Sequence, residues 1–138
     1  MTPIRVFALA FFVALGFLNS QAQSAKFYAL YFDGNSALVK GQSDKAIDFY
    51  NQALKIFQAD YVYFNRGNAF FDKKDWKSAL ADYDKTLSLN KTYAEAFCQR
   101  GLVKLQLSDP GACDDFKKAI KGGSEDAKTA YEKNCKKK

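Results

Sequence analysis

The stretch YVYFNRGNAFFDKKDWKSALADYDKTL, residues 61–87, predicts two amphipathic helices joined by a short turn. In each half, apolar residues recur at the three- and four-residue spacing of one helix face. They are Tyr63, Gly67, Phe70 and Phe71 in the first half, and Trp76, Ala79, Leu80, Tyr83 and Leu87 in the second. Polar residues 73–75 separate the halves, and Asp75 is a suitable N-cap. We expect Gly67 to meet Ala79, so that the helix axes approach closely and aromatic rings fill the groove on either side.

The same pattern occurs three times along the chain. Four columns of residues repeat in register, with a spacing of about 33 residues. They are Gly34, Gly67 and Gly101; Ala46, Ala79 and Ala112; Tyr50, Tyr83 and Phe116; and Ala53, Thr86 and Ala119. A repeat of this period is the signature of a solenoid, in which each unit packs against its neighbours.

These columns resemble the tetratricopeptide repeat (TPR) family, whose unit is a 34-residue helix–turn–helix. The resemblance implies an all-α fold of three repeats, at 27–59, 60–93 and 94–121, stacked as a right-handed α-solenoid. A polar C-terminal capping helix at 124–135, capped by Ser124 after Gly122-Gly123, is expected to cover the last apolar face. Residues 23–138 then form one TPR domain.

Two departures from the family pattern fall in the outer repeats. Position 11, usually aromatic, is Ala37 in the first copy and Lys104 in the third. In the third copy the turn is one residue short, and Ser108-Asp109-Pro110 is expected to open the second helix, where proline is tolerated.

Residues 1–22 are predicted to be a secretory signal peptide. Arg5 precedes an apolar run at 6–18, and Ser20 and Ala22 form a small-residue cleavage site. The alternative is a membrane anchor, but about 13 apolar residues at ~1.5 Å each fall short of a ~30 Å hydrocarbon core. We therefore expect an exported protein that is soluble in the periplasm or outside the cell, without membrane insertion after cleavage. The C-terminal repeat also looks similar to exported TPR proteins of Bacteroidetes-type bacteria.

The composition excludes several kinds of chemistry. The 138 residues include no histidine, so neither a Ser-His-Asp nor a Cys-His catalytic group can form. The three cysteines do not have the spacing of a metal site, and no glycine-rich phosphate loop occurs. The net charge of +6 is too weak to indicate nucleic-acid binding unless the charges cluster, and we expect no nucleic-acid partner. We expect a protein that is not an enzyme and has no metal or other cofactor.

The TPR resemblance also implies a concave groove lined by the first helix of each repeat. The groove would carry aromatic anchors and amide hydrogen-bonding groups suited to an extended peptide. Its predicted residues are Tyr28, Tyr31, Asn35, Tyr61, Phe64, Asn65, Asn68, Phe71, Gln99 and Leu102. The alternative is that several of these rings pack between repeats.

Some TPR domains grip the C-terminal carboxylate of chaperone tails with two asparagines and three cationic side chains. Asn35 and Asn65 occupy both asparagine positions, but Tyr31, Glu95 and Gln99 stand at the cationic ones. Because the charge-assisted hydrogen bonds are missing, we expect no chaperone-tail function.

The sequence therefore predicts a non-catalytic protein–protein interaction module that binds a protein or peptide segment in its groove. The alternative is a self-associating structural component of an envelope assembly. The apolar run FYALYF at 27–32 favours a weak homodimer through the first helix, because no earlier repeat covers it. In that version Phe27, Tyr28 and Phe32 are exposed.

The cysteines allow three single pairings, and helical-hairpin geometry favours Cys113 with Cys135. If the chain reverses at Gly122-Gly123, the two lie at similar distances from the turn. Cys98 is expected on the groove side, away from the capping helix. Three buried, reduced cysteines are the alternative.

Overall fold

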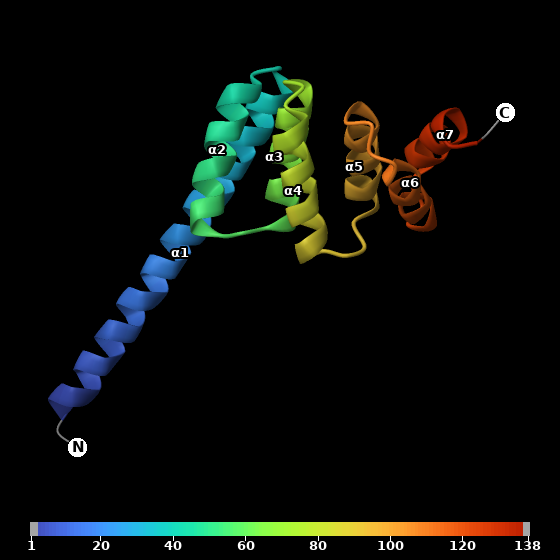
Figure 1. The fold of residues 1–138 in the computed structure, drawn as a ribbon. Coiled ribbons are helices and arrows are strands. Elements are labelled where there is room, and N and C mark those ends of the chain that lie inside the picture. The colour runs from blue at the N-terminus through green and yellow to red at the C-terminus, as the bar shows by residue number, and fades with distance from the viewer. Residues whose placement is uncertain (1–2, 137–138) are drawn as a thin grey trace.

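The computed structural model describes the backbone of residues 3–136 and the side chains of residues 16–136. Within this range the chain forms seven α-helices and no strand (Figure 1). Their bounds are α1 Pro3–Val39, α2 Ser43–Ile56, α3 Asp60–Asp72, α4 Trp76–Leu89, α5 Ala94–Gln106, α6 Ala112–Lys121 and α7 Glu125–Asn134.

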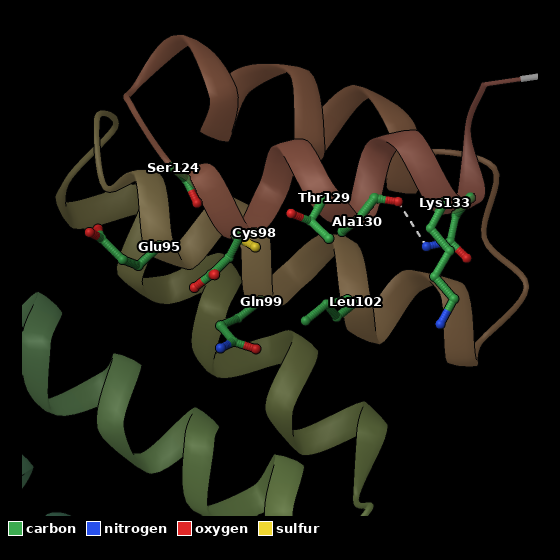
Figure 2. A pocket seen from close by; sticks show the side chains of 10 residues that line it. Glu95, Cys98, Gln99, Leu102, Ser124, Thr129, Ala130 and Lys133 are labelled. Carbon is green, nitrogen blue, oxygen red and sulfur yellow. Dashed lines mark hydrogen bonds between the residues drawn. The ribbon is translucent and has the colours of Figure 1, made fainter.

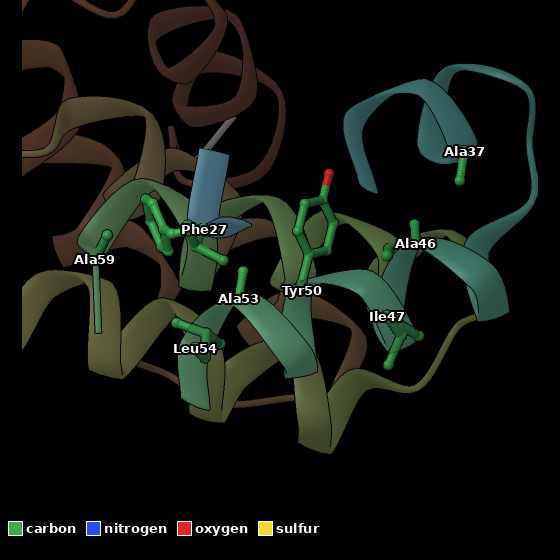
Figure 3. Close-up of a cluster of buried hydrophobic side chains, with 10 residues drawn as sticks. Phe27, Ala37, Ala46, Ile47, Tyr50, Ala53, Leu54 and Ala59 are labelled. Atoms are coloured by element: carbon green, nitrogen blue, oxygen red, sulfur yellow. The ribbon is translucent and has the colours of Figure 1, made fainter. Parts of the chain in front are cut away.

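The helices pair as consecutive hairpins, α1 with α2, α3 with α4 and α5 with α6. Each hairpin packs on the next through its second helix, and α7 covers α6 and contacts α5. The fold is thus an all-α solenoid of three helix–turn–helix repeats with a C-terminal helix, as the sequence predicts. Its first cluster of buried side chains joins α1, α2 and α3 around Phe27, Tyr50 and Leu54 (Figure 3).

The repeated glycine makes room for an aromatic ring of the facing helix. A Cβ on Gly34 would lie 2.5 Å from Tyr50, on Gly67 2.8 Å from Tyr83, and on Gly101 2.6 Å from Phe116. The expectation that the glycine faces the column alanine is wrong in this detail. The ring four residues further along lies over the glycine instead, so that the glycine and aromatic columns act as one packing unit.

The helix termini agree with the sequence prediction at two caps and differ at a third. The Asp75 side chain accepts a hydrogen bond from the Ser78 N–H at 3.2 Å, and Ser124 accepts one from the Ala127 N–H at 3.2 Å. Pro110, however, lies before α6, which begins at Ala112 with Gly111 as its N-cap. The missing residue of the third repeat therefore shortens its second helix instead of its turn.

The first helix is longer than the first repeat. Helix α1 runs without a break from Pro3 to Val39 and extends away from the solenoid (Figure 1). Within the described residues, no helix has the length and apolarity needed to cross a membrane. The prediction that Phe27 is exposed is wrong: its ring packs edge-on against Phe57 and Tyr61 and is only 4% exposed. Tyr28 and Phe32 are exposed, as predicted.

Candidate functional site

The ten predicted groove residues lie on the first helices of the three repeats, α1, α3 and α5. Tyr28 is about half exposed, at 51%, and the other nine are partly buried. None of the ten side chains is fully buried, and only Tyr28 in this set is classed as exposed. The apolar members of the set are partly buried because most of them pack against the clusters of buried side chains.

The N-terminal part of this surface is a hydrogen-bonded cluster between α1 and α3. The Asn65 Nδ2 donates to the Asn35 Oδ1 at 2.9 Å and to the Tyr31 hydroxyl at 3.3 Å. The Tyr31 ring also meets the Tyr61 ring edge-on, with centroids 5.0 Å apart. Burial raises the pKa of Tyr61, and the neighbouring groups Tyr28, Tyr31 and Asp60 raise it further, so its hydroxyl stays protonated at neutral pH. The cluster therefore offers uncharged hydrogen-bonding groups beside aromatic faces.

The two asparagines at equivalent positions of the first and second repeats have a structural task that the sequence analysis missed. The Tyr50 hydroxyl donates to the Asn35 Oδ1 at 2.8 Å, and the Tyr83 hydroxyl donates to the Asn68 Oδ1 at 2.8 Å. Each amide oxygen thus satisfies the buried tyrosine that covers the repeat's glycine. Among the described residues the Asn68 Nδ2 has no hydrogen-bond partner, so this amide keeps its donor for a ligand.

The remaining rings of the second repeat are engaged on one side. Phe64 stacks on Tyr93, with ring centroids 4.9 Å apart, and also contacts Tyr83. Phe71 meets Trp76 edge-on at 5.2 Å. Both phenylalanines also pack against the cluster of Ala79, Tyr83 and Val103, which joins the second repeat to the third. The contacts of these two phenylalanines with other rings lie within the second repeat, so for them the alternative that the rings pack between repeats stays a prediction.

The C-terminal part of the surface is a depression of about 400 Å³ between α5 and α7 (Figure 2). Its α5 wall contains Glu95, Gln99 and Leu102, and its α7 wall contains Thr129 and Lys133. Helix α7 thus does more than cover an apolar face, because it provides a second wall for the third repeat's part of the groove. This contribution was not predicted from the sequence, from which the helix was expected only to cover the last apolar face.

Cys98 lines the depression between α5 and α7, on the side where it was predicted, but the prediction that it lies away from the capping helix is wrong. It is buried in the cluster of α5, α6 and α7 and lies against the capping helix, near Ser124 (Figure 2). Burial raises the pKa of its thiol, although a hydrogen bond with Ser124 acts in the opposite direction. Cys113 and Cys135 form a disulfide in the structure, with their Cα atoms 5.8 Å apart. This link joins the start of α6 to the end of α7.

Two ion pairs between the helices of a repeat also escaped the sequence analysis. Arg66 forms two hydrogen bonds with Asp82, at 2.7 and 2.8 Å, and Arg100 does the same with Asp115. The signal was present as a further column pair in register, Arg66 with Arg100 and Asp82 with Asp115. Among the described residues, no group of histidine, cysteine, aspartate or glutamate side chains could hold a metal ion.

Comparison with known proteins gives matches along most of the chain. The family described as "TPR repeat" matches residues 67–108, and that described as "Tetratricopeptide repeat" matches residues 29–60. RNA polymerase II-associated protein 3 of Xenopus tropicalis is 35% identical over 63% of this chain and 14% of its own length. The co-chaperone sgt12 of Aspergillus fumigatus is 31% identical over 72% of this chain and 31% of its own length. The chain thus spans less than a third of either relative.

Solved structures of similar shape are also found. The Arabidopsis OM64 TPR domain superposes with a TM-score of 0.78 at 26% identity, covering 80% of this chain and 95% of that one. The first TPR of Spaghetti (RPAP3), bound to the HSP90 peptide SRMEEVD, superposes with a TM-score of 0.76 at 25% identity, covering 80% and 90%.

Proposed function

The chain belongs to the tetratricopeptide repeat family, and from that premise we propose that it is a non-catalytic interaction module that binds a protein or peptide segment along its first helices. One observation carries this proposal: all ten side chains predicted for the groove stay at least partly exposed. Two solved neighbours, the first TPR of Spaghetti (RPAP3) and the second TPR domain of human RPAP3, are bound to an HSP90 and an HSP70 peptide, so the same fold holds peptides in other proteins.

The chemistry of the surface favours an uncharged or weakly charged segment with apolar side chains. Tyr28 and Tyr61 present aromatic edges, and the Asn68 amide keeps a free donor for a peptide carbonyl. The hydrogen bonds that Asn65 donates to Tyr31 and Asn35 fix these three side chains in place before a ligand arrives. Such preorganisation lowers the entropy lost on binding.

An acidic peptide that ends in a carboxylate fits this surface poorly. Tyr31, Glu95 and Gln99 stand where carboxylate-gripping TPR domains carry cations. Asn35 and Asn65 occupy the matching amide positions, but their side chains bond to each other and to Tyr50. The groove therefore lacks the charged donors that make carboxylate capture strong.

The protein's place in the cell follows from its first 22 residues. We propose a signal peptide cleaved after Ala22, export to the periplasm or the medium, and a soluble domain from residue 23. A bacterial source of the Bacteroidetes type belongs to the same proposal, which rests on the sequence alone. The relatives named above come from eukaryotes.

Self-association through α1 is a second candidate function, favoured by the exposed rings on that helix. Tyr28 and Phe32 are 51% and 63% exposed and lie four residues apart, on one face of α1. Phe57, after α2, is also exposed and touches the same region through Phe27. Exposed apolar side chains grouped in this way are typical of contact surfaces. A strict monomer at high concentration in sedimentation would contradict this candidate.

To test the groove, partners of the full chain are captured from the envelope fraction and identified by mass spectrometry. The partner segment that binds is then titrated into the protein by calorimetry. We expect Tyr28→Ala combined with Gln99→Ala to weaken binding about tenfold or more, because both side chains are accessible in the free protein. The matched control is Leu89→Ala, which removes an exposed apolar side chain from α4. Peptide SRMEEVD should show no saturable binding. Equal effects of the two variants, or tight binding of SRMEEVD, would contradict the proposal.

A further inference from the structure

A second depression lies away from the groove, where the α4–α5 loop meets the end of α6. Its volume is about 520 Å³, within the range of small-molecule sites. It is lined by Lys91, Thr92, Phe97, Lys118, Lys121 and Gly122. No carboxylate is among these described residues. The site therefore combines one aromatic ring, one hydroxyl and three cationic side chains.

The three lysines are free to meet an anion. Within residues 16–136, none of them forms an ion pair, whereas Lys104, Lys117 and Lys128 do. The Lys118 Nζ lies 5.4 Å from the centroid of the Phe97 ring, a cation–π contact. Their like charges repel one another across the depression, and an anion between them would relieve that repulsion.

The ring and the backbone of the site are firmly held. The Arg100 guanidinium lies 5.4 Å from the Phe97 centroid and is itself fixed by Asp115 and Asp84. A Cβ on Gly122 would lie 2.6 Å from the Ala94 Cβ, so the turn that follows α6 packs closely on the start of α5. The lysine-bearing segments are therefore carried on rigid parts of the fold.

The second repeat provides an internal comparison. Its ring, Tyr63, has an arginine and a lysine at similar distances, 5.3 Å to Arg66 and 5.9 Å to Lys85. At the positions 33 and 34 residues before Lys121 and Lys91, however, the chain has Ser88 and Phe57. The second and third repeats thus share the ring with its two cations, and only the ring of the third repeat has two additional lysines beside it.

We propose that this depression binds a small organic phosphate monoester, with its phosphate among Lys91, Lys118 and Lys121 and its apolar part against Phe97. Lysine is a common point-charge partner of phosphate, and three lysine charges suit a phosphate monoester, which carries more negative charge than a single carboxylate. The arginine beside the ring, Arg100, is already occupied by Asp115 and Asp84. The Thr92 hydroxyl adds a donor at the rim. This site is separate from the proposed groove.

The test titrates the full chain with phenyl phosphate as the probe. Binding is measured by calorimetry and by the changes in amide chemical shifts in NMR. We expect saturable binding with shifts centred on Thr92, Phe97 and Gly122. Lys91→Gln combined with Lys121→Gln should weaken it about tenfold or more, because two charge-assisted contacts are lost. The matched control, Lys85→Gln in the second repeat, should leave it unchanged. All three lysines are exposed, and an unchanged melting temperature will verify folding.

Further probes separate the sources of the phosphate. Inorganic phosphate should bind several-fold more weakly than phenyl phosphate, and phenol should not bind. Binding only to phosphatidic acid vesicles would overturn the proposal in favour of a membrane surface. Equal weakening by Lys85→Gln, or equal affinity for inorganic phosphate, would also overturn it. The groove variant Tyr28→Ala with Gln99→Ala should leave phenyl phosphate binding intact, so failure of one site does not imply failure of the other.

Discussion

The second and third repeats hold their two helices together with the same arginine–aspartate pair in different surroundings. In the second repeat, Asp82 faces one cation, Arg66, whose Nη1 also donates to the Asn51 Oδ1 at 2.6 Å. In the third repeat, Asp115 faces Arg100 and also Lys104, whose Nζ is 2.8 Å away. Both carboxylates are buried. The difference therefore lies in the number of cations.

The second cation reverses the direction of the pKa shift. Burial raises the pKa of Asp82, and the hydrogen bond and charge of Arg66 only partly oppose it. Burial acts in the same way on Asp115, but Arg100 and Lys104 together lower its pKa below its ordinary value of 3.8. Lys104 stands where the second repeat has the aromatic Phe70, so the departure from the repeat pattern has an electrostatic consequence.

The largest expected effect comes from removing each carboxylate. Asp115→Asn should lower the free energy of unfolding by about 5 kcal/mol and Asp82→Asn by about 3 kcal/mol, because breaking a buried pair leaves unpaired charge. In the first variant Lys104 loses its carboxylate and Arg100 keeps only the exposed Asp84, whereas in the second variant Arg66 alone loses its carboxylate. Urea unfolding followed by circular dichroism measures both, with the exposed Asp48→Asn as control. Equal losses at the two sites would mean that Lys104 adds nothing.

The second and third repeats also differ in the helix that packs over their C-terminal face. The second repeat is covered by α5, whereas α6 is covered by the short α7, which is tied by Cys113–Cys135. We expect Cys135→Ser to cost about 3 kcal/mol, since the disulfide closes a loop with a sequence separation of 22. Hydrogen exchange should place the loss in α6 and α7. Mass spectrometry of non-reduced tryptic peptides checks the pairing, and three free thiols or a bridge to Cys98 would contradict it.

The ring over the glycine differs between the repeats by one hydroxyl. Tyr83 donates to Asn68, whereas the third repeat places Phe116 in one cluster with Leu102. Phe116→Tyr should cost about 1–3 kcal/mol, because its hydroxyl would be buried without an acceptor. Adding Leu102→Asn should recover most of that loss by restoring the second repeat's pair. A double-mutant cycle from thermal unfolding measures the coupling, and additive losses would show that the two positions do not interact.

Lowering the pH should change the stabilising contributions of Asp82 and Asp115 in opposite directions. Asp115 has a lowered folded pKa, so its stabilising contribution is present above the ordinary pKa of 3.8 and is lost as the pH falls through the folded value. Asp82 has a raised folded pKa, so its contribution is present below the ordinary value and is lost as the pH rises through the folded value. Hydrogen exchange between pH 5 and about pH 3 should therefore show α6 losing protection before α4. Lys104→Met should remove the difference.

The smallest expected effect concerns the turn between the two helices of each repeat. The equivalent residues Gly41, Lys74 and Ser108 have φ values of +70°, +59° and +56°, a conformation that favours glycine. Lys74→Gly and Ser108→Gly should each raise stability by about 0.5–1 kcal/mol in urea unfolding. We expect the same gain in both repeats, because the turn does not involve the ion pairs. Unequal gains would point to a general difference between the repeats.

The repeat columns were sufficient to predict the architecture and much of the packing. Glycine at 67 and tyrosine at 83 recur in register because a ring must fit over a backbone without a side chain, and that requirement is visible in any copy. The N-caps Asp75 and Ser124 were predictable for a similar reason, since capping depends on a residue and its immediate successors. The ten groove residues were placed on the correct helices.

What those groove residues do could not be obtained from spacing. Asn35 and Asn68 were expected to serve a ligand, yet their oxygens satisfy buried tyrosines that lie 15 residues further along. Phe27 was expected to be exposed, yet Phe57 and Tyr61 cover it. In each case the partner lies on another helix, and its distance depends on how the helices cross.

Periodicity, glycine spacing and local caps are properties of neighbouring residues along the chain, so the amino-acid order of this protein was enough to specify its helices and their repetition. The pairing of Arg100 and Lys104 with Asp115, the burial of Cys98 against α7 and the wall that α7 adds to the groove depend on contacts between helices. Such contacts have energies that vary steeply with distance and burial, and these become definite only when the helices have packed.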